Sequence, residues 1–476
     1  MSNKEQPFIH LFKTSTGYYL YDVNMDKILK ISQKVYRFLD SSGIEFSEDP
    51  EVLQYLEIIK RIGFLKSTHV EETEHPDTNY VGYYLKSGLE NLVLQVTQNC
   101  NLRCEYCVYS EGSGYNHRHH NNKRMTWETA KKAIDYFLEH SKDSDVIYVG
   151  FYGGEPLLEI PLIKQCMDYI LENAEFRQVN FNITTNATLL NEEIIQFLVD
   201  YHVYLLFSFD GPKHVQNAGR KFAGTGEGTY DKVMENIEIF QEKHKEYFEQ
   251  YVDFNSVLCE GSSFQEIYDF YRTEPKFQGA KISIGFPSDA DRDTGIKVKD
   301  NYYAEYLYYR FLLFLYKTGW FHTEKPYICS PKDINLIGHV EKTMGSTNKE
   351  LPKKGHHSGP CLPGVFRMFV NIDGDIFSCE RVSEVAGKGY IGNLETGIDE
   401  NKVKECINFE QLTPKRCHNC WAYNQCNLCV TYLDKLQKEN SDGICEICEN
   451  VKKRTEANLK DYVILNELGY NPNIRY

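Results

Sequence analysis

Hydrophobic and polar positions follow two alternating patterns from about residue 91 onward. Short apolar runs rich in β-branched and aromatic residues are followed by longer runs with helical periodicity. The predicted strands span 92–97, 146–152, 179–184, 203–209, 251–258 and 281–286, and the predicted helices span 127–140, 161–173, 192–201, 230–244 and 264–271. Strands joined by crossover helices predict an α/β fold with a parallel sheet, here a curved and incomplete barrel of six βα units.

The flanking segments follow other patterns. Two strands at 8–12 and 18–22 and two helices at 31–39 and 51–62 are expected before a polar linker at 66–79. Further helices are expected at 301–317 and 450–468. We therefore predict four parts: an N-terminal module at 1–80, the barrel at 88–300, a helical bridge at 301–355 and a cysteine-rich domain at 356–476.

Composition narrows the class of protein. The 476 residues are 41% hydrophobic and 25% charged, as in soluble globular chains of several domains. The net charge of -15 and the lack of a basic stripe argue against a nucleic-acid partner. No secretion signal or membrane-spanning apolar run is visible, so we expect a cytoplasmic protein without a membrane partner.

The fifteen cysteines give the strongest indication of the chemistry of this protein. Without a secretory signal they are poor candidates for disulfides, and their clustering indicates metal ligation. Cys100, Cys104 and Cys107 form a C-x3-C-x2-C loop directly after the first barrel strand. Three thiolates can hold three irons of a 4Fe-4S cube and leave the fourth iron open to a cofactor. A structural zinc site and three unrelated buried cysteines are the alternatives.

This loop resembles the signature of the radical S-adenosylmethionine (SAM) superfamily. The resemblance implies that SAM binds the open iron and that Tyr106, before the last cysteine, packs near its adenine. The sequence GGEP after the second strand matches the superfamily motif that meets the SAM amino group, through Gly153, Gly154 and Glu155. Glycine also allows close backbone approach to a ligand, although Gly-Gly and Glu-Pro are common in ordinary turns.

The ends of the next two strands extend the resemblance. The segment ITTNATLL supplies Thr184 and Asn186, with Ala187 where relatives carry glycine. The segment FSFDG supplies Ser208 and Asp210, which the resemblance implies to contact the ribose or carboxylate of SAM, and Arg220 is expected to pair with that carboxylate. Polar strand ends followed by turns are the alternative interpretation.

The C-terminal cysteines resemble the SPASM extension of radical peptide-modifying enzymes. That resemblance implies a first auxiliary 4Fe-4S cluster on Cys361, Cys379 and Cys429, and a second on Cys417, Cys420 and Cys426 with Cys445 or Cys448. If only one of Cys445 and Cys448 binds the second cluster, the other could complete the first. Otherwise the first cluster keeps an open iron. Cys426 and Cys429 are separated by two residues where the family has three, and paired CxxC spacing alone is also typical of zinc.

A hairpin is predicted about Asp373 and Gly374, and we expect it to present Cys379 beside the barrel mouth. Glu380 follows Cys379 at the position where sulfatase-maturating relatives have a catalytic base. An exposed hairpin glutamate is the alternative for this residue.

The whole chain resembles radical maturases of ribosomally synthesised peptides, which implies a partial (β/α)6 TIM-like barrel, a winged-helix-like recognition module and a SPASM domain. In such enzymes the module captures a leader peptide as an added strand, here near Tyr18–Asp22, unless it is only a packing domain. We expect SAM and three 4Fe-4S clusters as cofactors, a precursor peptide as substrate, and a reductase such as flavodoxin or ferredoxin as electron donor. The expected product is a thioether between a cysteine sulfur and a carbon. A carbon-carbon crosslink, formylglycine formation in a sulfatase, and a non-catalytic iron-sulfur or zinc protein are the alternatives.

Overall fold

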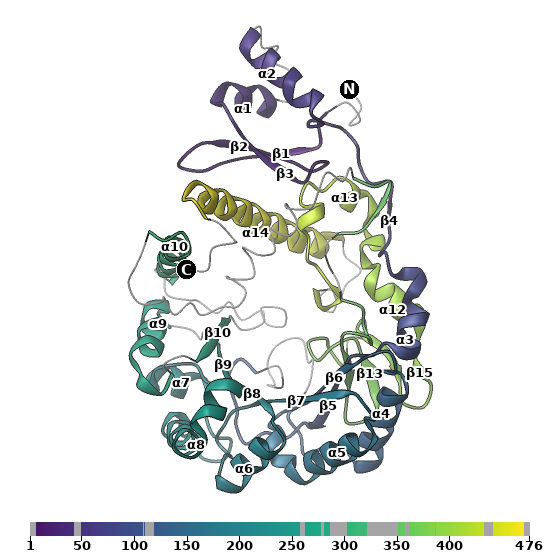
Figure 1. Cartoon of the computed structure of the whole chain (residues 1–476), viewed down its shortest axis with the longest axis vertical. Helices are drawn as coiled ribbons and strands as arrows, with labels where there is room; N and C mark the ends of the chain where they lie inside the picture. The colour runs from purple at the N-terminus through teal and green to yellow at the C-terminus, as the bar shows by residue number, and fades with distance from the viewer. Residues whose placement is uncertain are drawn as a thin grey trace.

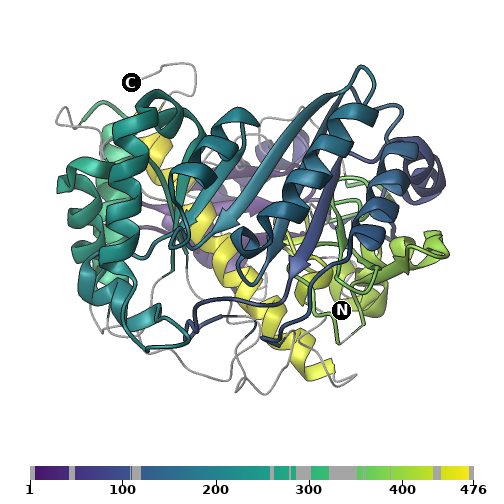
Figure 2. The ribbon, with the colours of Figure 1, turned by 90° about the horizontal axis from the view of Figure 1, so that it is seen from below.

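A curved sheet with helices on its outer side contains most of the largest hydrophobic core of the described residues. The computed structural model describes residues 6–41, 49–107, 109, 119–257, 262–277, 280–285, 302–320, 351–357, 359, 361–385, 387–432 and 441–470. In these parts no helix is long and apolar enough to cross a membrane. Figures 1 and 2 show the outer helices on one side of the sheet and the long helix α14 (Ser441–Glu467) on the other.

Ten strands make up this sheet. In spatial order they are β10 (Lys281–Gly285), β9 (Val252–Val257), β8 (Tyr204–Ser208), β7 (Gln178–Thr185), β6 (Val146–Gly153), β5 (Asn91–Thr97), β12 (Met368–Val370), β13 (Asp375–Phe377), β14 (Tyr390–Asn393) and β15 (Gly397–Ile398). Strands β5 to β10 are all parallel, as the βα pattern predicts. The α/β architecture with six parallel strands is therefore confirmed, and the described strands do not close into a full barrel.

The helices between these strands also match the predicted segments. They are α4 (Trp127–Glu139), α5 (Ile160–Asn173), α6 (Glu192–Asp200), α7 (Lys213–Gly219), α8 (Tyr230–Tyr251) and α9 (Phe264–Thr273). Side chains of Thr126, Asn191 and Ser263 cap the starts of α4, α6 and α9. Helix α8 continues past the predicted end through a non-helical residue at His244, and the short helix α7 was not predicted.

The N-terminal module has one strand more than predicted. Strands β1 (Ile9–Lys13), β2 (Tyr18–Asp22) and β3 (Lys27–Ile31) form an antiparallel sheet beside helices α1 (Gln33–Asp40) and α2 (Pro50–Arg61). Because β2 pairs on both sides, residues 18–22 cannot be the edge that accepts a further strand. The expectation of an edge near Tyr18–Asp22 is therefore wrong, and β1 and β3 are the edges.

The N-terminal module packs against the C-terminal region. His10 of β1 stacks on Trp421 with ring centroids 3.5 Å apart and contacts Glu456 of α14 at 3.0 Å. The expected linker contains β4 (Glu72–Thr73), which pairs with β11 (Lys354–Gly355). The other α-helices of the described residues are α3 (Val81–Ser87) before the barrel, α10 (Tyr302–Lys317) after it, and α12 (Glu400–Ile407) and α13 (Pro414–His418) in the C-terminal region. Much of the predicted bridge at 301–355 lies outside the described residues.

Candidate active site

The first cysteine loop begins where β5 ends, at the carboxyl edge of the parallel sheet. Its backbone is fixed by hydrogen bonds to the segment after α7, since Arg103 N–H donates to Lys221 O and Glu105 N–H donates to Gly219 O. Two backbone N–H groups also point at sulfur: Leu102 N lies 3.3 Å from Cys100 Sγ, and Tyr109 N lies 3.5 Å from Cys107 Sγ. Such donors stabilise thiolate sulfur in an iron-sulfur site.

Burial raises the pKa of two of these thiols, Cys100 and Cys104. Burial, and then the charge of Glu155, raise the pKa of Cys100 to about 12. Burial also raises the pKa of Cys104 to about 12, against the opposing charge of Arg220. Each of these two thiols interacts electrostatically with Cys107, so the fold gathers all three. Three converging thiols of this kind fit a cluster whose positive charge deprotonates its ligands.

The two glycines of the GGEP turn pack directly on the cysteine loop. A Cβ on Gly153, whose φ is +149°, would lie 2.2 Å from Thr97 O, and a Cβ on Gly154 would lie 2.2 Å from Asn99 O. Gly154 N–H donates to Thr97 O, and Glu155 N–H donates to Asn99 O. In this structure the glycines therefore serve close contact between β6 and the loop that carries Cys100.

Glu155 ties the ends of β6 and β7 together. Its fully buried carboxylate accepts hydrogen bonds from Leu157 N, Thr185 Oγ1 and Asn186 N at 2.7–3.0 Å. Burial raises the pKa of Glu155, while these donors act to lower it. Asn186 in turn donates to Asn101 Oδ1 in the cysteine loop, and its amide lies 3.9 Å from Cys100 Sγ. Glu155 and Asn186, two of the expected cofactor residues, are thus part of one network around the loop.

A second buried network closes the other side of the loop. Arg220 forms a two-pronged ion pair with Asp210, with N–O distances of 2.9 and 3.0 Å. Asp210 also accepts from Val257 N and from the hydroxyl of Tyr106, and the guanidinium lies 5.3 Å from the Tyr106 ring. The guanidinium expected to pair with the SAM carboxylate is therefore paired with Asp210 in this structure.

A cavity of about 510 Å³ is lined by residues of all six parallel strands. Because helices cover the outer face of the sheet, this cavity lies on its concave face. Thr184 lines this cavity, whereas Ser208 is half-buried at the end of β8. Glu380 also lines it, and its carboxylate accepts a hydrogen bond from Arg367 at 2.6 Å. Glu380 therefore faces the cavity in an ion pair, with 16% of its side chain exposed.

The hairpin that carries Glu380 is oriented opposite to our expectation. Strand β12 runs parallel to β5, with Phe369 opposite Val93, and β13 returns antiparallel. The turn at Asp373 and Gly374 therefore lies at the carboxyl ends of the barrel strands, and Cys379 lies at their amino ends. The predicted hairpin is confirmed, but Cys379 is not beside the edge that carries the Cys100 loop.

A second group of thiols gathers around Cys379. Burial, and then the charges of Glu380, Cys361 and Cys429, raise the pKa of Cys379 to about 12. Cys361 is exposed on one side and interacts with Cys429, Arg367 and Glu380. The three cysteines expected to share the first auxiliary cluster are thus brought together beside Glu380.

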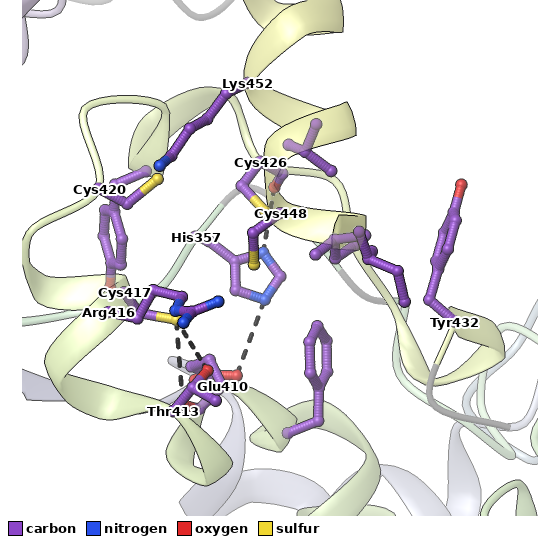
Figure 3. A pocket seen from close by; sticks show the side chains of 15 residues that line it. His357, Glu410, Thr413, Arg416, Cys417, Cys420, Cys426, Tyr432, Cys448 and Lys452 are labelled. Atoms are coloured by element: carbon purple, nitrogen blue, oxygen red, sulfur yellow. Dashed lines mark hydrogen bonds and ion pairs between the residues drawn. The ribbon is translucent and has the colours of Figure 1, made fainter. Parts of the chain in front are cut away.

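A third group of thiols lines a separate cavity, shown in Figure 3. It comprises Cys417, Cys420, Cys426 and Cys448. Burial raises the pKa of Cys417 to about 11 and that of Cys426 to about 12, and the Cys448 thiol adds to both shifts. Cys448 is therefore placed with the other three, while the side chain of Cys445 lies outside the described residues.

Several residues of the first site were missed by sequence reasoning. Thr185, rather than its neighbour Thr184, contacts Glu155. Gln216 accepts from Asp210 N, and Ser256 donates to Asp210 O. These residues follow no motif, but alternation along β7 could have separated the cavity-facing Thr184 from Thr185.

Comparisons with known proteins agree with this geometry. Residues 94–273 match the radical SAM superfamily. The chain is 25% identical over 374 residues to the radical SAM cyclopropyl synthase TigE of Paramaledivibacter caminithermalis, covering 73% of this chain and 69% of TigE. It is 26% identical over 396 residues to a cysteine-type anaerobic sulfatase-maturating enzyme of Clostridium novyi, covering 78% of this chain and 96% of that protein.

Two further matches complete the comparison. The chain is 40% identical over 124 residues to the uncharacterized protein MJ0907 of Methanocaldococcus jannaschii, which covers 26% of this chain and only 40% of that protein's length. The solved structure described as native anSMEcpe with bound AdoMet and Cp18Cys peptide has the same fold, with a TM-score of 0.53 and 19% identity over 77% of this chain and 99% of the other. Proteins of the matched superfamily use SAM and a 4Fe-4S cluster, and the gathered thiols fit this chemistry. Residues 94–273 therefore form a radical SAM domain, and the chain resembles the SPASM-type maturases over most of its length.

Proposed function

We propose that this enzyme installs a thioether crosslink, from a cysteine sulfur to a carbon, in a ribosomally made precursor peptide. The observation that carries the proposal is the thiol group of Cys361, Cys379 and Cys429, which adjoins Glu380 at the 510 Å³ cavity. A metal cluster held by only three of these thiols would keep one iron open for a substrate thiolate. The cavity volume is within the range of small-ligand sites and leaves room for one or two peptide side chains.

In this proposal Cys100, Cys104 and Cys107 hold the 4Fe-4S cluster of the radical SAM domain. When bound, this cluster and SAM supply a 5'-deoxyadenosyl radical, which removes a hydrogen atom from the substrate. Gly153 and Gly154 keep the loop against β6, and the remaining cofactor contacts come from the cysteine loop, the strand ends and the residue after α7. These are Tyr106, Glu155, Thr184, Asn186, Ser208, Asp210 and Arg220.

Seven of the C-terminal cysteines supply two auxiliary sites. Cys361, Cys379 and Cys429 hold the first 4Fe-4S cluster, and Cys417, Cys420, Cys426 and Cys448 hold the second. We choose Cys448 over Cys445 because the Cys448 thiol lines the same cavity as Cys417, Cys420 and Cys426. Glu380, fixed by Arg367, accepts the proton that the substrate thiol loses. A flavodoxin or ferredoxin supplies the electron that starts the reaction, and the electron released when the carbon-sulfur bond forms would leave through the first auxiliary cluster.

The N-terminal module recruits the leader of the precursor peptide. An extended leader adds as a strand to the edge of β3 (Lys27–Ile31), which pairs only with β2 among the described strands. The opposite edge strand, β1, packs against α14 through His10, whereas β3 meets that helix through the ion pair of Lys30 and Glu467, so we choose the edge of β3.

Oxidation of a sulfatase cysteine or serine to formylglycine is the second candidate. The match to the Clostridium novyi protein favours it, since that match covers 96% of a sulfatase-maturating enzyme. Carbon-carbon bond formation is a third candidate, supported by the match to TigE, whose name describes a cyclopropyl synthase. All three reactions begin with the same hydrogen abstraction, so the cofactor site alone does not separate them.

The experiment has two stages. Anaerobic reconstitution with iron and sulfide, followed by reduction in the presence of SAM, should release 5'-deoxyadenosine. Without this nucleoside, the chain is a non-catalytic metal-binding protein. The precursor peptide encoded beside the gene is then added and analysed by tandem mass spectrometry. Loss of two hydrogens together with loss of the alkylatable thiol supports a thioether. Loss of two hydrogens with the thiol retained indicates a carbon-carbon bond, and formylglycine in a sulfatase peptide indicates the second candidate.

A further inference from the structure

Two histidines and a glutamate form a buried polar group beside the third group of thiols, and two of them, His357 and Glu410, line the same cavity. His356 and His357 follow β11, and Glu410 lies in a short 3-10 helix at Phe409–Leu412. All three side chains are almost fully buried: 6% of His356, 4% of His357 and 1% of Glu410 is exposed. Figure 3 shows His357 and Glu410 facing each other beside Cys417 and Cys426. None of the proposed functions uses this group.

The spacing of the donor atoms suits a metal ion better than direct hydrogen bonds. His356 Nε2 lies 3.4 Å from Glu410 Oε1, and His357 Nε2 lies 3.7 Å from Glu410 Oε2. These distances exceed the ~2.7–3.2 Å of an ordinary N–H···O hydrogen bond. Two ligands bound tetrahedrally to one zinc at ~2.0–2.1 Å are separated by about 3.4 Å. One donor atom from each residue lies within 4.8 Å of the other two.

The hydrogen bonding of the group points the same way. Neither carboxylate oxygen of Glu410 has a hydrogen-bond partner among the described residues, and neither does His357 Nε2. The other ring nitrogen of His357 lies 3.0 Å from Cys426 O and 2.9 Å from Gly359 N, which fixes the ring with Nε2 toward Glu410. His356 Nε2 lies 3.0 Å from Ile407 O, so an ion would replace that contact. A buried carboxylate without a partner is costly, and a bound cation would remove that cost.

We propose that His356, His357 and Glu410 bind one divalent transition-metal ion, zinc or ferrous iron, separate from the thiol groups. Two imidazoles and one carboxylate form a donor set that both ions accept. The ion joins segments far apart in the sequence, since β11 pairs with β4 and Glu410 precedes Cys417 by seven residues. The bound ion therefore stabilises the wall of the cavity that is lined by Cys417, Cys420, Cys426 and Cys448. This inference does not depend on which bond the enzyme forms.

The test uses the full-length holoenzyme with its iron-sulfur clusters reconstituted, so that cysteines are occupied. The protein is loaded with Zn²⁺, desalted, and analysed for zinc by mass spectrometry and by zinc K-edge X-ray absorption. In a second arm it is loaded with ⁵⁷Fe²⁺ after cluster assembly with natural iron, and Mössbauer spectra are recorded. The variant is Glu410→Gln, which keeps the size of the side chain. The matched control is His75→Gln, because the His75 ring packs 4.6 Å from that of His356 without belonging to the donor set.

We expect an equimolar amount of zinc bound only by nitrogen and oxygen, or a high-spin ferrous signal in the iron arm. Glu410→Gln should reduce the bound ion at least tenfold and lower the thermal midpoint, whereas His75→Gln should retain the ion. No bound ion in the wild type, or zinc bound by sulfur, would overturn the proposal. An equimolar amount of bound ion in Glu410→Gln would also overturn the proposal. If Glu410→Gln does not fold, the ligand atoms seen in the wild-type absorption spectrum decide the question.

Discussion

Gly154 offers the sharpest test of how the fold positions the first cysteine loop. In the substitution Gly154→Ala, the new Cβ would lie 2.2 Å from Asn99 O, 2.6 Å from Asn99 C and 3.1 Å from Cys100 Cβ. These obstacles are the backbone and the Cβ of the loop itself, so no side chain can rotate away to relieve the contact. The loop that carries Cys100 must therefore move away from β6.

The size of the movement follows from the distances. A carbon and an oxygen not bonded to each other rarely approach closer than about 3.2 Å, so the contact at 2.2 Å requires a displacement of about 1 Å. Overpacking of this kind costs about 1–3 kcal/mol of stability. A displacement of ~1 Å at a reacting centre can reduce the rate about 100-fold. We therefore expect Gly154→Ala to release 5'-deoxyadenosine about 100-fold more slowly than the wild type.

The assay is anaerobic turnover of SAM in reconstituted protein, with bound iron measured in parallel. The control is Gly224→Ala, since a Cβ at Gly224 would meet nothing within 4 Å. It should leave both the iron content and the rate unchanged. Wild-type rate and iron content in Gly154→Ala would refute the reasoning, because they would show that the loop absorbs the contact without disturbing Cys100.

Three other variants test the remaining groups. Arg220→Lys should lower stability by about 1–3 kcal/mol, because lysine cannot reproduce the two-pronged pair with buried Asp210, and an unchanged thermal midpoint would contradict this. Glu380→Gln should lower peptide product formation about 10²–10⁴-fold while 5'-deoxyadenosine is still released; full product formation would reduce Glu380 to an anchor for Arg367. Cys448→Ala should lose about four irons per chain, whereas Cys166→Ala, in the core and remote from the thiol groups, should lose none. Equal iron in both cysteine variants would exclude Cys448 as a ligand.

The sequence predicted the barrel well because its strands and helices have strong and different periodicities. Every predicted strand from 92 to 286 has a counterpart in β5 to β10, within two residues at each end. The missed strand β3 (Lys27–Ile31) has the sequence KILKI, whose two lysines interrupt the apolar run and lead directly into α1. Local pattern does not show which neighbour a strand pairs with, so the central position of β2 was also missed.

In the candidate site, too, the motifs predicted which residues take part but not which residues they contact. The motifs placed Asp210 and Arg220 in the site, but they did not show that these side chains pair with each other, because that contact depends on how α7 packs. Likewise, the spacing of the cysteines did not decide between Cys445 and Cys448. The structure adds that α14 carries the Cys448 thiol into the cavity with Cys417, Cys420 and Cys426, while the side chain of Cys445 lies outside the described residues.

The direction of the C-terminal hairpin has a consequence for how substrate and radical meet. Since β12 is parallel to β5, the Cys100 loop lies at the carboxyl ends of the strands, and Cys379 and Glu380 lie at the amino ends. The cavity on the concave side is lined from Asn91 and Lys281 at the amino ends to Thr184 near the carboxyl end of β7. A side chain entering from the amino ends would pass Glu380 before it reaches the radical SAM domain's loop. Proton removal and hydrogen abstraction would then act on one substrate from opposite ends of the same cavity, which keeps the two steps spatially separate.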